Sequence, residues 1–85
     1  MPPIEFVDSA KKHDISEADA RYAIANAEVV QLVEPGVVLV IGHLHAQTDR
    51  WLEILARALP SGDKRVFHVM ELGSKFRPFL EEAQK

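Results

Sequence analysis

Five consecutive apolar residues at positions 37–41 (Val-Val-Leu-Val-Ile) constrain the fold of this chain more than any other stretch. The run lacks the apolar–polar alternation of a strand that has one face in water. Such a run is typical of a strand that is covered on both faces, or of one that lies in the centre of its sheet. It therefore predicts a strand of one of these two kinds.

The length and composition of the chain bound its class. Its 85 residues predict a single small domain spanning positions 1–85. It has no cysteine, so disulfide bonds and zinc–thiolate sites are excluded. No apolar run approaches the roughly 18 residues of a membrane span, and the N-terminus lacks the charged-then-apolar pattern of a signal peptide. We therefore expect a cytoplasmic protein with no membrane partner.

The overall charge is acidic, with a formal net charge of −3 and an isoelectric point of about 5.7. Proteins that bind a nucleic-acid backbone usually carry an excess of lysine and arginine. The overall charge thus argues against nucleic-acid binding by the whole surface, but it remains compatible with a local basic patch.

Two helices are expected before the first strand. Residues 3–13 suit a short helix, with Lys12 and His13 at its C-terminal end. These cations complement the helix dipole, or they belong to a phosphate-binding surface. Ser16 is expected to cap a second helix, with Asp19 where a capping box usually has Glu or Gln.

The middle of the chain predicts strands, with one segment left open. Residues 29–33 are short and β-branched, and a Glu-Pro-Gly turn joins them to residues 37–41. Residues 50–59 fit either a helix or a strand. We favour the strand because residues 60–63 (Pro-Ser-Gly-Asp) form a turn and a clear strand follows, which would otherwise lack a hairpin partner.

This hairpin fixes which side chains share a face. A four-residue loop predicts the cross-strand pairs Leu59–Lys64, Ala56–Phe67 and Ile54–Val69. On the other face, Leu55 lies opposite His68. Glu53 and Arg57 then occupy the diagonals of His68, within reach of a long side chain. The alternation of side chains along the two strands therefore predicts a cluster of Glu53, His68 and Arg57.

A terminal helix completes the predicted fold. Ser74 is expected to cap a helix from about Lys75 to Gln84, unless Pro78 moves its start to near Arg77. The elements together predict an α+β fold with two N-terminal helices, a four-stranded antiparallel sheet and a C-terminal helix.

The candidate site centres on His68, which interrupts an apolar strand. A ribonuclease that works without a metal needs a base for the 2′-hydroxyl proton, an acid for the leaving 5′-oxygen and cations for the phosphorane-like transition state. The catalytic candidates are His68, Glu53 and Arg57, and the candidates for binding RNA or phosphate are Lys75, Arg77, Lys12 and His13. In the alternative interpretation, His68 is a packed core residue and Glu53 and Arg57 form a simple ion pair.

Other motifs do not predict a cofactor. His43 and His45 are spaced as two metal ligands at a strand end, but no third ligand of a suitable type is close in sequence. The sequence also lacks a glycine-rich phosphate loop and the motif of a serine or cysteine nucleophile. We therefore expect neither a metal nor another cofactor.

Several short motifs resemble those of a known family. They are Lys12-His13-Asp14-Ile15-Ser16, Val40-Ile41-Gly42, Trp51-Leu52-Glu53-Ile54 and, above all, Phe67-His68-Val69-Met70 followed by Lys75-Phe76. In this order, nearly the whole chain resembles the BrnT-like toxins of bacterial type II toxin–antitoxin modules, which have a RelE-like fold. The resemblance implies a metal-independent ribonuclease that is neutralised by a DNA-binding antitoxin encoded beside it. It also supports a strand at residues 50–59.

The sequence departs from this family after the last strand. Where the family carries an arginine-rich stretch, this chain has Met70, Glu71 and Gly73 and keeps Lys75 and Arg77. Two functions are therefore expected: a BrnT-like toxin with ribonuclease activity, or a RelE-like protein without catalysis that binds and regulates another protein.

Overall fold

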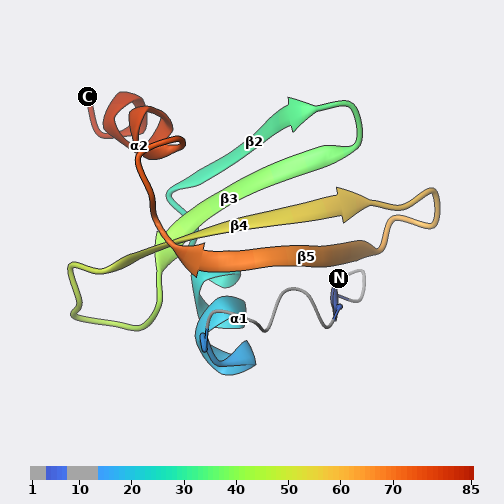
Figure 1. Cartoon of the computed structure of the whole chain (residues 1–85), viewed down its shortest axis with the longest axis horizontal. Coiled ribbons are helices and arrows are strands. Elements are labelled where there is room, and N and C mark those ends of the chain that lie inside the picture. Colours follow the sequence, from blue (N-terminus) through green and yellow to red (C-terminus); the bar gives the residue numbers. More distant parts are fainter. Residues whose placement is uncertain (1–3, 8–13) are drawn as a thin grey trace.

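The computed structural model describes residues 4–7 and 14–85 and has an α+β fold (Figure 1). The elements within these residues are, in chain order, β1 (Ile4–Phe6), α1 (Glu17–Ala25), β2 (Val29–Glu34), β3 (Val37–His43), β4 (Trp51–Ala58), β5 (Lys64–Glu71) and α2 (Arg77–Ala83). The strands form one sheet in the order β1-β5-β4-β3-β2. The four predicted strands, β2 to β5, are present and antiparallel.

The N-terminal segment differs from the prediction. The helix expected over residues 3–13 is wrong for residues 4–6, because they form β1, a fifth strand that runs parallel to β5. The sheet is therefore mixed. Ile4 and Phe6 pack against the core on one side of this strand, and Glu5 between them is exposed. This alternation suits a strand at a sheet edge. The rest of the predicted helix, with Lys12 and His13, lies outside the described residues.

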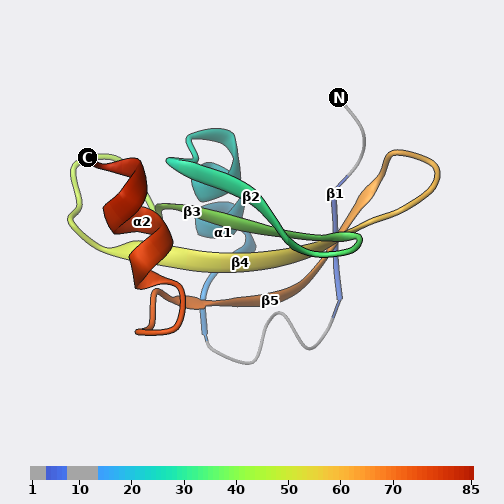
Figure 2. The same ribbon diagram turned by 90° about the horizontal axis from the view of Figure 1, so that it is seen from above.

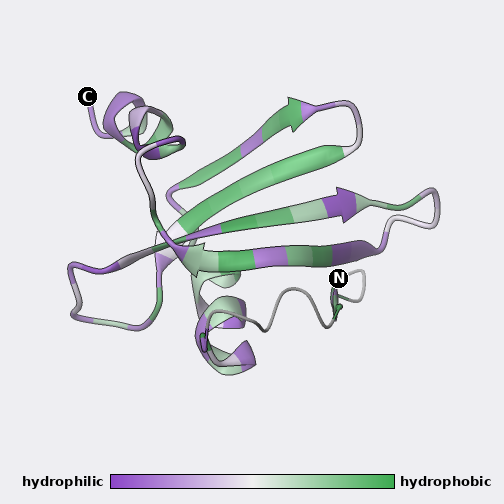
Figure 3. Ribbon diagram, viewed as in Figure 1, coloured by the Kyte–Doolittle hydropathy of each residue, from purple (hydrophilic) through white to green (hydrophobic). Residues whose placement is uncertain are grey.

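Strand β3 is covered on both faces, which is one of the two arrangements that its apolar run predicts. Val40 packs in a cluster with Ala20 and Ala23 of α1. Leu39 and Ile41 point to the opposite face, where they pack with Leu80 of α2 and its neighbours. The two helices lie on opposite sides of the sheet (Figure 2), and β3 is hydrophobic along most of its length (Figure 3). We call these the α1 face and the α2 face.

Residues 50–59 form strand β4 over Trp51–Ala58, so the strand interpretation is confirmed. Its apolar residues Leu52, Ile54 and Ala56 are buried on the α1 face. Glu53, Leu55 and Arg57 alternate with these residues along the strand and therefore lie on the α2 face. Strand β4 pairs with β5, the strand that follows the turn, as the hairpin interpretation requires.

A β-bulge in β5 changes the predicted register. The pairs Ile54–Val69 and Leu55–His68 are confirmed, but Ala56 pairs with Val66 instead of Phe67. Phe67 is therefore an extra residue in β5. A bulge of this kind turns two successive side chains to the same side of a sheet. Phe67 and His68 thus share the α2 face, while Val66 and Val69 remain in the opposite core.

The starts of the helices follow the sequence in part, because the N-cap of α2 is Phe76 and not the predicted Ser74. The Ser16 hydroxyl accepts a hydrogen bond from the backbone N–H of Asp19 at 3.0 Å, so the predicted cap of α1 is confirmed. Helix α2 begins at Arg77, the later of the two expected starts, with Pro78 in its first turn. Proline is tolerated there because the first N–H groups of a helix have no intrahelical partner.

Substituting Gly42 in β3 tests the tight packing of α1 on the sheet. A Cβ atom at this position would lie 2.4 Å from the carbonyl oxygen of Ala23. We expect Gly42→Ala to lower the free energy of unfolding by about 1–3 kcal/mol, measured by urea denaturation. At Gly73 a Cβ would meet only Glu53 Oε1 at 3.5 Å. Gly73→Ala is the matched control, expected to stay within about 0.5 kcal/mol of the parent; equal effects would contradict the packing account.

Candidate functional site

The site is built around the carboxylate of Glu53, a buried charged residue of β4 with 5% exposure. Its Oε2 atom lies 2.9 Å from Nε2 of His68 on β5. Its Oε1 atom accepts a hydrogen bond of 2.8 Å from the backbone N–H of Gly73, in the loop that leads to α2. Burial of a carboxylate is costly unless its oxygens are hydrogen-bonded, and here both oxygens have partners.

This carboxylate fixes the orientation of the His68 ring. An ionised carboxylate can only accept, so the bond assigns the proton of the neutral imidazole to Nε2 and the lone pair to Nδ1. The His68 side chain is 24% exposed, whereas that of Glu53 is 7% exposed. A histidine held in one tautomer by a carboxylate behind it is a common arrangement for proton transfer.

A groove lies beside His68 on the α2 face. Its volume is about 450 Å³. It is lined by Val33, Glu34, Val37, Leu55, Arg57, Phe67, Lys75, Phe76 and Phe79. Leu55 is the cross-strand partner of His68, and Phe67 precedes it in the chain. The histidine therefore adjoins the groove through two of its lining residues.

Two cations in this groove lie over aromatic rings. The guanidinium carbon of Arg57 is 5.3 Å from the ring centre of Phe67. The Lys75 ammonium is 5.2 Å from the ring centre of Phe76. Such cation–π contacts hold the charged groups close to an apolar surface. The groove thus combines positive charge with flat aromatic faces, and Glu34 adds one acidic group to its wall.

A third cation, Arg65, was missed by the sequence analysis. The bulge pairs Arg65 with Arg57 across β4 and β5 and so places both on the α2 face. Without the bulge, Arg65 would lie opposite Ala58 on the other face. Arg65 also approaches Glu5 of β1, with 3.5 Å between Nε and the carboxylate. The adjoining ends of β4 and β5 are accordingly hydrophilic (Figure 3).

The predicted site residues do not all meet. His68 and Glu53 are joined by a hydrogen bond, and Arg57 and Lys75 line the groove beside them. Arg77 instead directs its Nη2 atom toward the carbonyl oxygen of Leu72, at 3.5 Å. Lys12 and His13 lie outside the described residues. The sequence analysis gave no role in the site to the aromatic walls of the groove, because the bulge and the docking of α2 create them.

The pair His43 and His45 has other contacts. The His43 ring stacks on Trp51 with 3.7 Å between ring centres, and its Nδ1 lies 3.1 Å from the carbonyl oxygen of Arg50. Nδ1 of His45 lies 2.8 Å from the carbonyl oxygen of Ala46. Across residues 4–7 and 14–85, no three side chains of the metal-binding types are grouped to hold an ion.

An ion pair at the other end of the β4–β5 hairpin shifts a pKa. The Arg50 guanidinium hydrogen-bonds the Glu71 carboxylate, and this bond raises the pKa of Arg50 above its ordinary value. Both side chains are about half exposed. The pair is thus an exposed ion pair of the kind that contributes little to stability.

Comparison of the chain with protein-family models, with curated proteins and with solved structures gave no match. Among the described residues, no helix is long and apolar enough to cross a membrane.

Replacing Glu53 by glutamine tests the role of the buried carboxylate. The amide must turn an N–H donor toward either His68 Nε2 or the Gly73 N–H, so one donor loses its acceptor or His68 must change its tautomer. We expect Glu53→Gln to lower the free energy of unfolding by about 1–3 kcal/mol. The matched control is Glu71→Gln, which removes an exposed carboxylate near the same end of the sheet and should cost less than about 1 kcal/mol. Urea denaturation of the two variants measures the difference, and equal values would contradict the structural role of Glu53.

Proposed function

We propose that this chain is a BrnT-like toxin with a RelE-like fold that cleaves single-stranded RNA in the cytoplasm without a metal. His68 acts as the acid–base group, and Glu53 positions it. Arg57, Lys75 and Arg65 hold the phosphate backbone. A co-encoded antitoxin would neutralise the toxin. The observation that carries this proposal is the hydrogen-bonded Glu53–His68 pair beside a groove of cations and aromatic rings.

The different burial of Glu53 and His68 indicates which of the two transfers protons, a choice that the sequence left open. Glu53 is 5% exposed and both its oxygens have hydrogen-bond partners. A group so enclosed supports its neighbour better than it contacts a substrate. His68 is the more exposed member, and imidazole is the side chain most often used for proton transfer. His68 is therefore assigned to proton transfer and Glu53 to positioning.

The reaction follows from this assignment. The His68 imidazole takes the proton of the ribose 2′-hydroxyl, whose oxygen forms a bond to phosphorus. The bond from phosphorus to the 5′-oxygen breaks, and the leaving oxygen takes a proton from water. The products are a 2′,3′-cyclic phosphate and a 5′-hydroxyl. The imidazolium formed on His68 is stabilised by the carboxylate behind it, and the groove cations face the charge that grows on the phosphoryl oxygens.

The groove also suits single-stranded RNA as a substrate. Unpaired bases stack on aromatic side chains, and this stacking tolerates any base. Phe67 and Phe79 are half-buried and supply such faces, while Arg57 and Lys75 line the same groove. This local patch reconciles RNA binding with an acidic chain.

A second function is a RelE-like protein without catalysis that binds and regulates another protein. It is favoured by the anchoring role of Glu53, since the bond from Gly73 to this carboxylate holds the loop before α2 whether or not any reaction occurs. Glu34 in the groove wall also lowers its positive potential. The two functions differ in the fate of added RNA.

Cleavage by the purified protein separates the two. The protein is incubated with single-stranded RNA in excess EDTA, and we expect fragments that end in 2′,3′-cyclic phosphate. His68→Ala should reduce the rate by at least about 100-fold, the usual contribution of an acid–base group. His45→Ala is the matched control, because His45 is an exposed loop histidine and should leave the rate unchanged. RNA that stays intact over a wide range of protein concentrations would leave only the regulatory function.

RNA affinity tests the groove separately from the chemistry. The double variant Arg57→Ala with Lys75→Ala should bind RNA more weakly, and the slope of log affinity against log salt should fall by about 0.7 for each cation removed. Fluorescence anisotropy in the inactive His68→Ala background measures both quantities. The matched control removes Arg50 and Lys85, two exposed cations that do not line the groove. An equal loss in the control would show that binding is only nonspecific charge attraction.

A further inference from the structure

Strand β2 lies at one edge of the sheet and exposes apolar side chains there. Within residues 4–7 and 14–85, β3 is its one neighbour in the sheet order, and no strand of this part of the chain pairs with the other side of its backbone. Val30 and Leu32 are 68% and 63% exposed on the α1 face of this strand. An edge strand with exposed β-branched and aliphatic residues is a template for pairing with another chain. Glu34, the last residue of this strand, also lines the groove beside His68.

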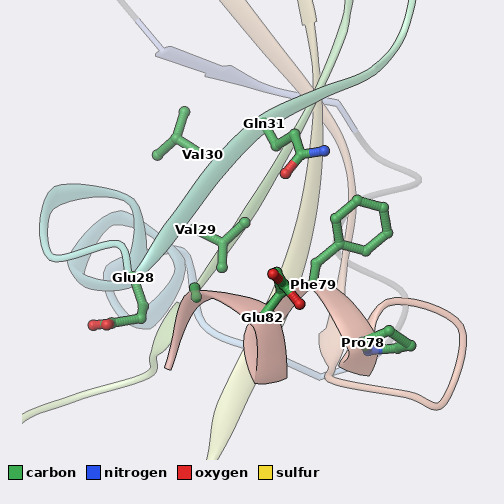
Figure 4. A pocket seen from close by; sticks show the side chains of 8 residues that line it. Glu28, Val29, Val30, Gln31, Pro78, Phe79 and Glu82 are labelled. Atoms are coloured by element: carbon green, nitrogen blue, oxygen red, sulfur yellow. The ribbon is translucent and has the colours of Figure 1, made fainter. Parts of the chain in front are cut away.

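A second groove flanks the same edge on the α2 face, between β2 and α2 (Figure 4). Its volume is about 500 Å³. The residues that line it are Glu28, Val29, Val30, Gln31, Pro78, Phe79, Glu82 and Ala83. Figure 4 shows Phe79 and Glu82 rising from α2 toward β2, with Val29 and Gln31 above them and Val30 pointing to the other side of the strand.

Three glutamates lie along this edge strand. Glu28 and Glu82 line the groove, and Glu34 ends β2; all three are exposed. Glu82 forms an ion pair of 3.1 Å with Lys85, in which both side chains are 76% exposed. A pair so exposed is weak and easily exchanged for another cation. The edge therefore offers exposed apolar side chains that are flanked by carboxylates.

We propose that the β2 edge and its acidic groove bind an extended, basic segment of a partner protein as an added β-strand. Backbone hydrogen bonds to β2 would supply affinity, and alternate side chains would supply specificity. Apolar residues of the segment cover Val30 and Leu32, and its lysines or arginines reach Glu28, Glu34 and Glu82. This proposal does not rest on RNA cleavage.

A second copy of the chain fits the edge less well than a basic segment. Two antiparallel β2 strands centred on Gln31 would align Val30 of one chain with Leu32 of the other. The same register places Glu28 opposite Glu34 at both ends. Like charges directly opposite one another destabilise a strand pair. Charge complementarity thus favours a basic partner over self-association.

Nuclear magnetic resonance on the ¹⁵N-labelled full chain tests the proposal with three synthetic peptides. The first alternates valine and lysine, the second replaces each lysine by glutamate, and the third is the lysine peptide with N-methyl groups on alternate amides. We expect the lysine peptide alone to bind, with shifts concentrated in the amides of residues 28–34 and 79–83. Absence of binding at millimolar peptide, equal binding of the glutamate or N-methylated peptide, or shifts centred elsewhere would overturn the proposal.

Charge reversal provides the matched variants. Glu28→Lys with Glu82→Lys should raise the dissociation constant of the lysine peptide by at least about fivefold. The control is Glu17→Lys with Glu81→Lys, which changes the net charge equally at exposed positions outside the groove. An equal loss in both double variants would overturn the proposal. So would a chain that is dimeric by sedimentation and becomes monomeric with Val30→Lys, because a second copy would then occupy the edge.

Discussion

The buried carboxylate of Glu53 is the interaction on which the α2 face depends. It lies on β4, and its two oxygens bind His68 on β5 and the backbone of Gly73 in the following loop. It therefore joins two strands to the segment that carries Lys75 and Phe76 onto the sheet. Once that segment is in place, Leu80 of α2 packs over β3. The candidate site and the second core layer thus share one anchor.

The bulge at Phe67 gives this face its particular chemistry. A regular strand would alternate its side chains and send either Phe67 or His68 into the opposite core. The extra residue allows both to remain on the α2 face, and it also brings Arg65 beside Arg57. The groove therefore owes the Phe67 part of its aromatic wall to a single inserted position. Bulges of this kind are common next to functional sites.

The sequence predicted the features that depend on the hydrophobic pattern and on the alternation of side chains along a strand. The apolar run at residues 37–41 indicated a strand covered on both faces or central in its sheet, and the turn at residues 60–63 decided between helix and strand for the segment before it. Counting from that turn correctly placed Leu55 opposite His68. It gave the wrong partners beyond that pair, because a bulge leaves no signature in the hydrophobic pattern of β5. Strand β1 was missed for a related reason, since three residues carry too short a pattern to separate strand from helix.

The contact at the centre of the candidate site was predicted, but the aromatic rings that surround it were not. The diagonal position of Glu53 was enough to suggest a contact with His68. The ring of Phe67 under Arg57, and that of Phe76 under Lys75, depend on how α2 docks on the sheet. Docking is a tertiary event that local sequence does not encode. Arg77 shows the converse, because its position in the sequence suggested phosphate binding while the fold turns it toward Leu72.

The state of the His68 ring is the most direct test of this account. A long-range ¹H–¹⁵N spectrum of the neutral imidazole reports which ring nitrogen carries the proton. We expect a proton on Nε2, held toward Glu53, and an unprotonated Nδ1; in Glu53→Gln the preference for this tautomer should weaken. A proton on Nδ1, or a tautomer mixture that Glu53→Gln leaves unchanged, would contradict the claim that the buried carboxylate prepares His68 for proton transfer.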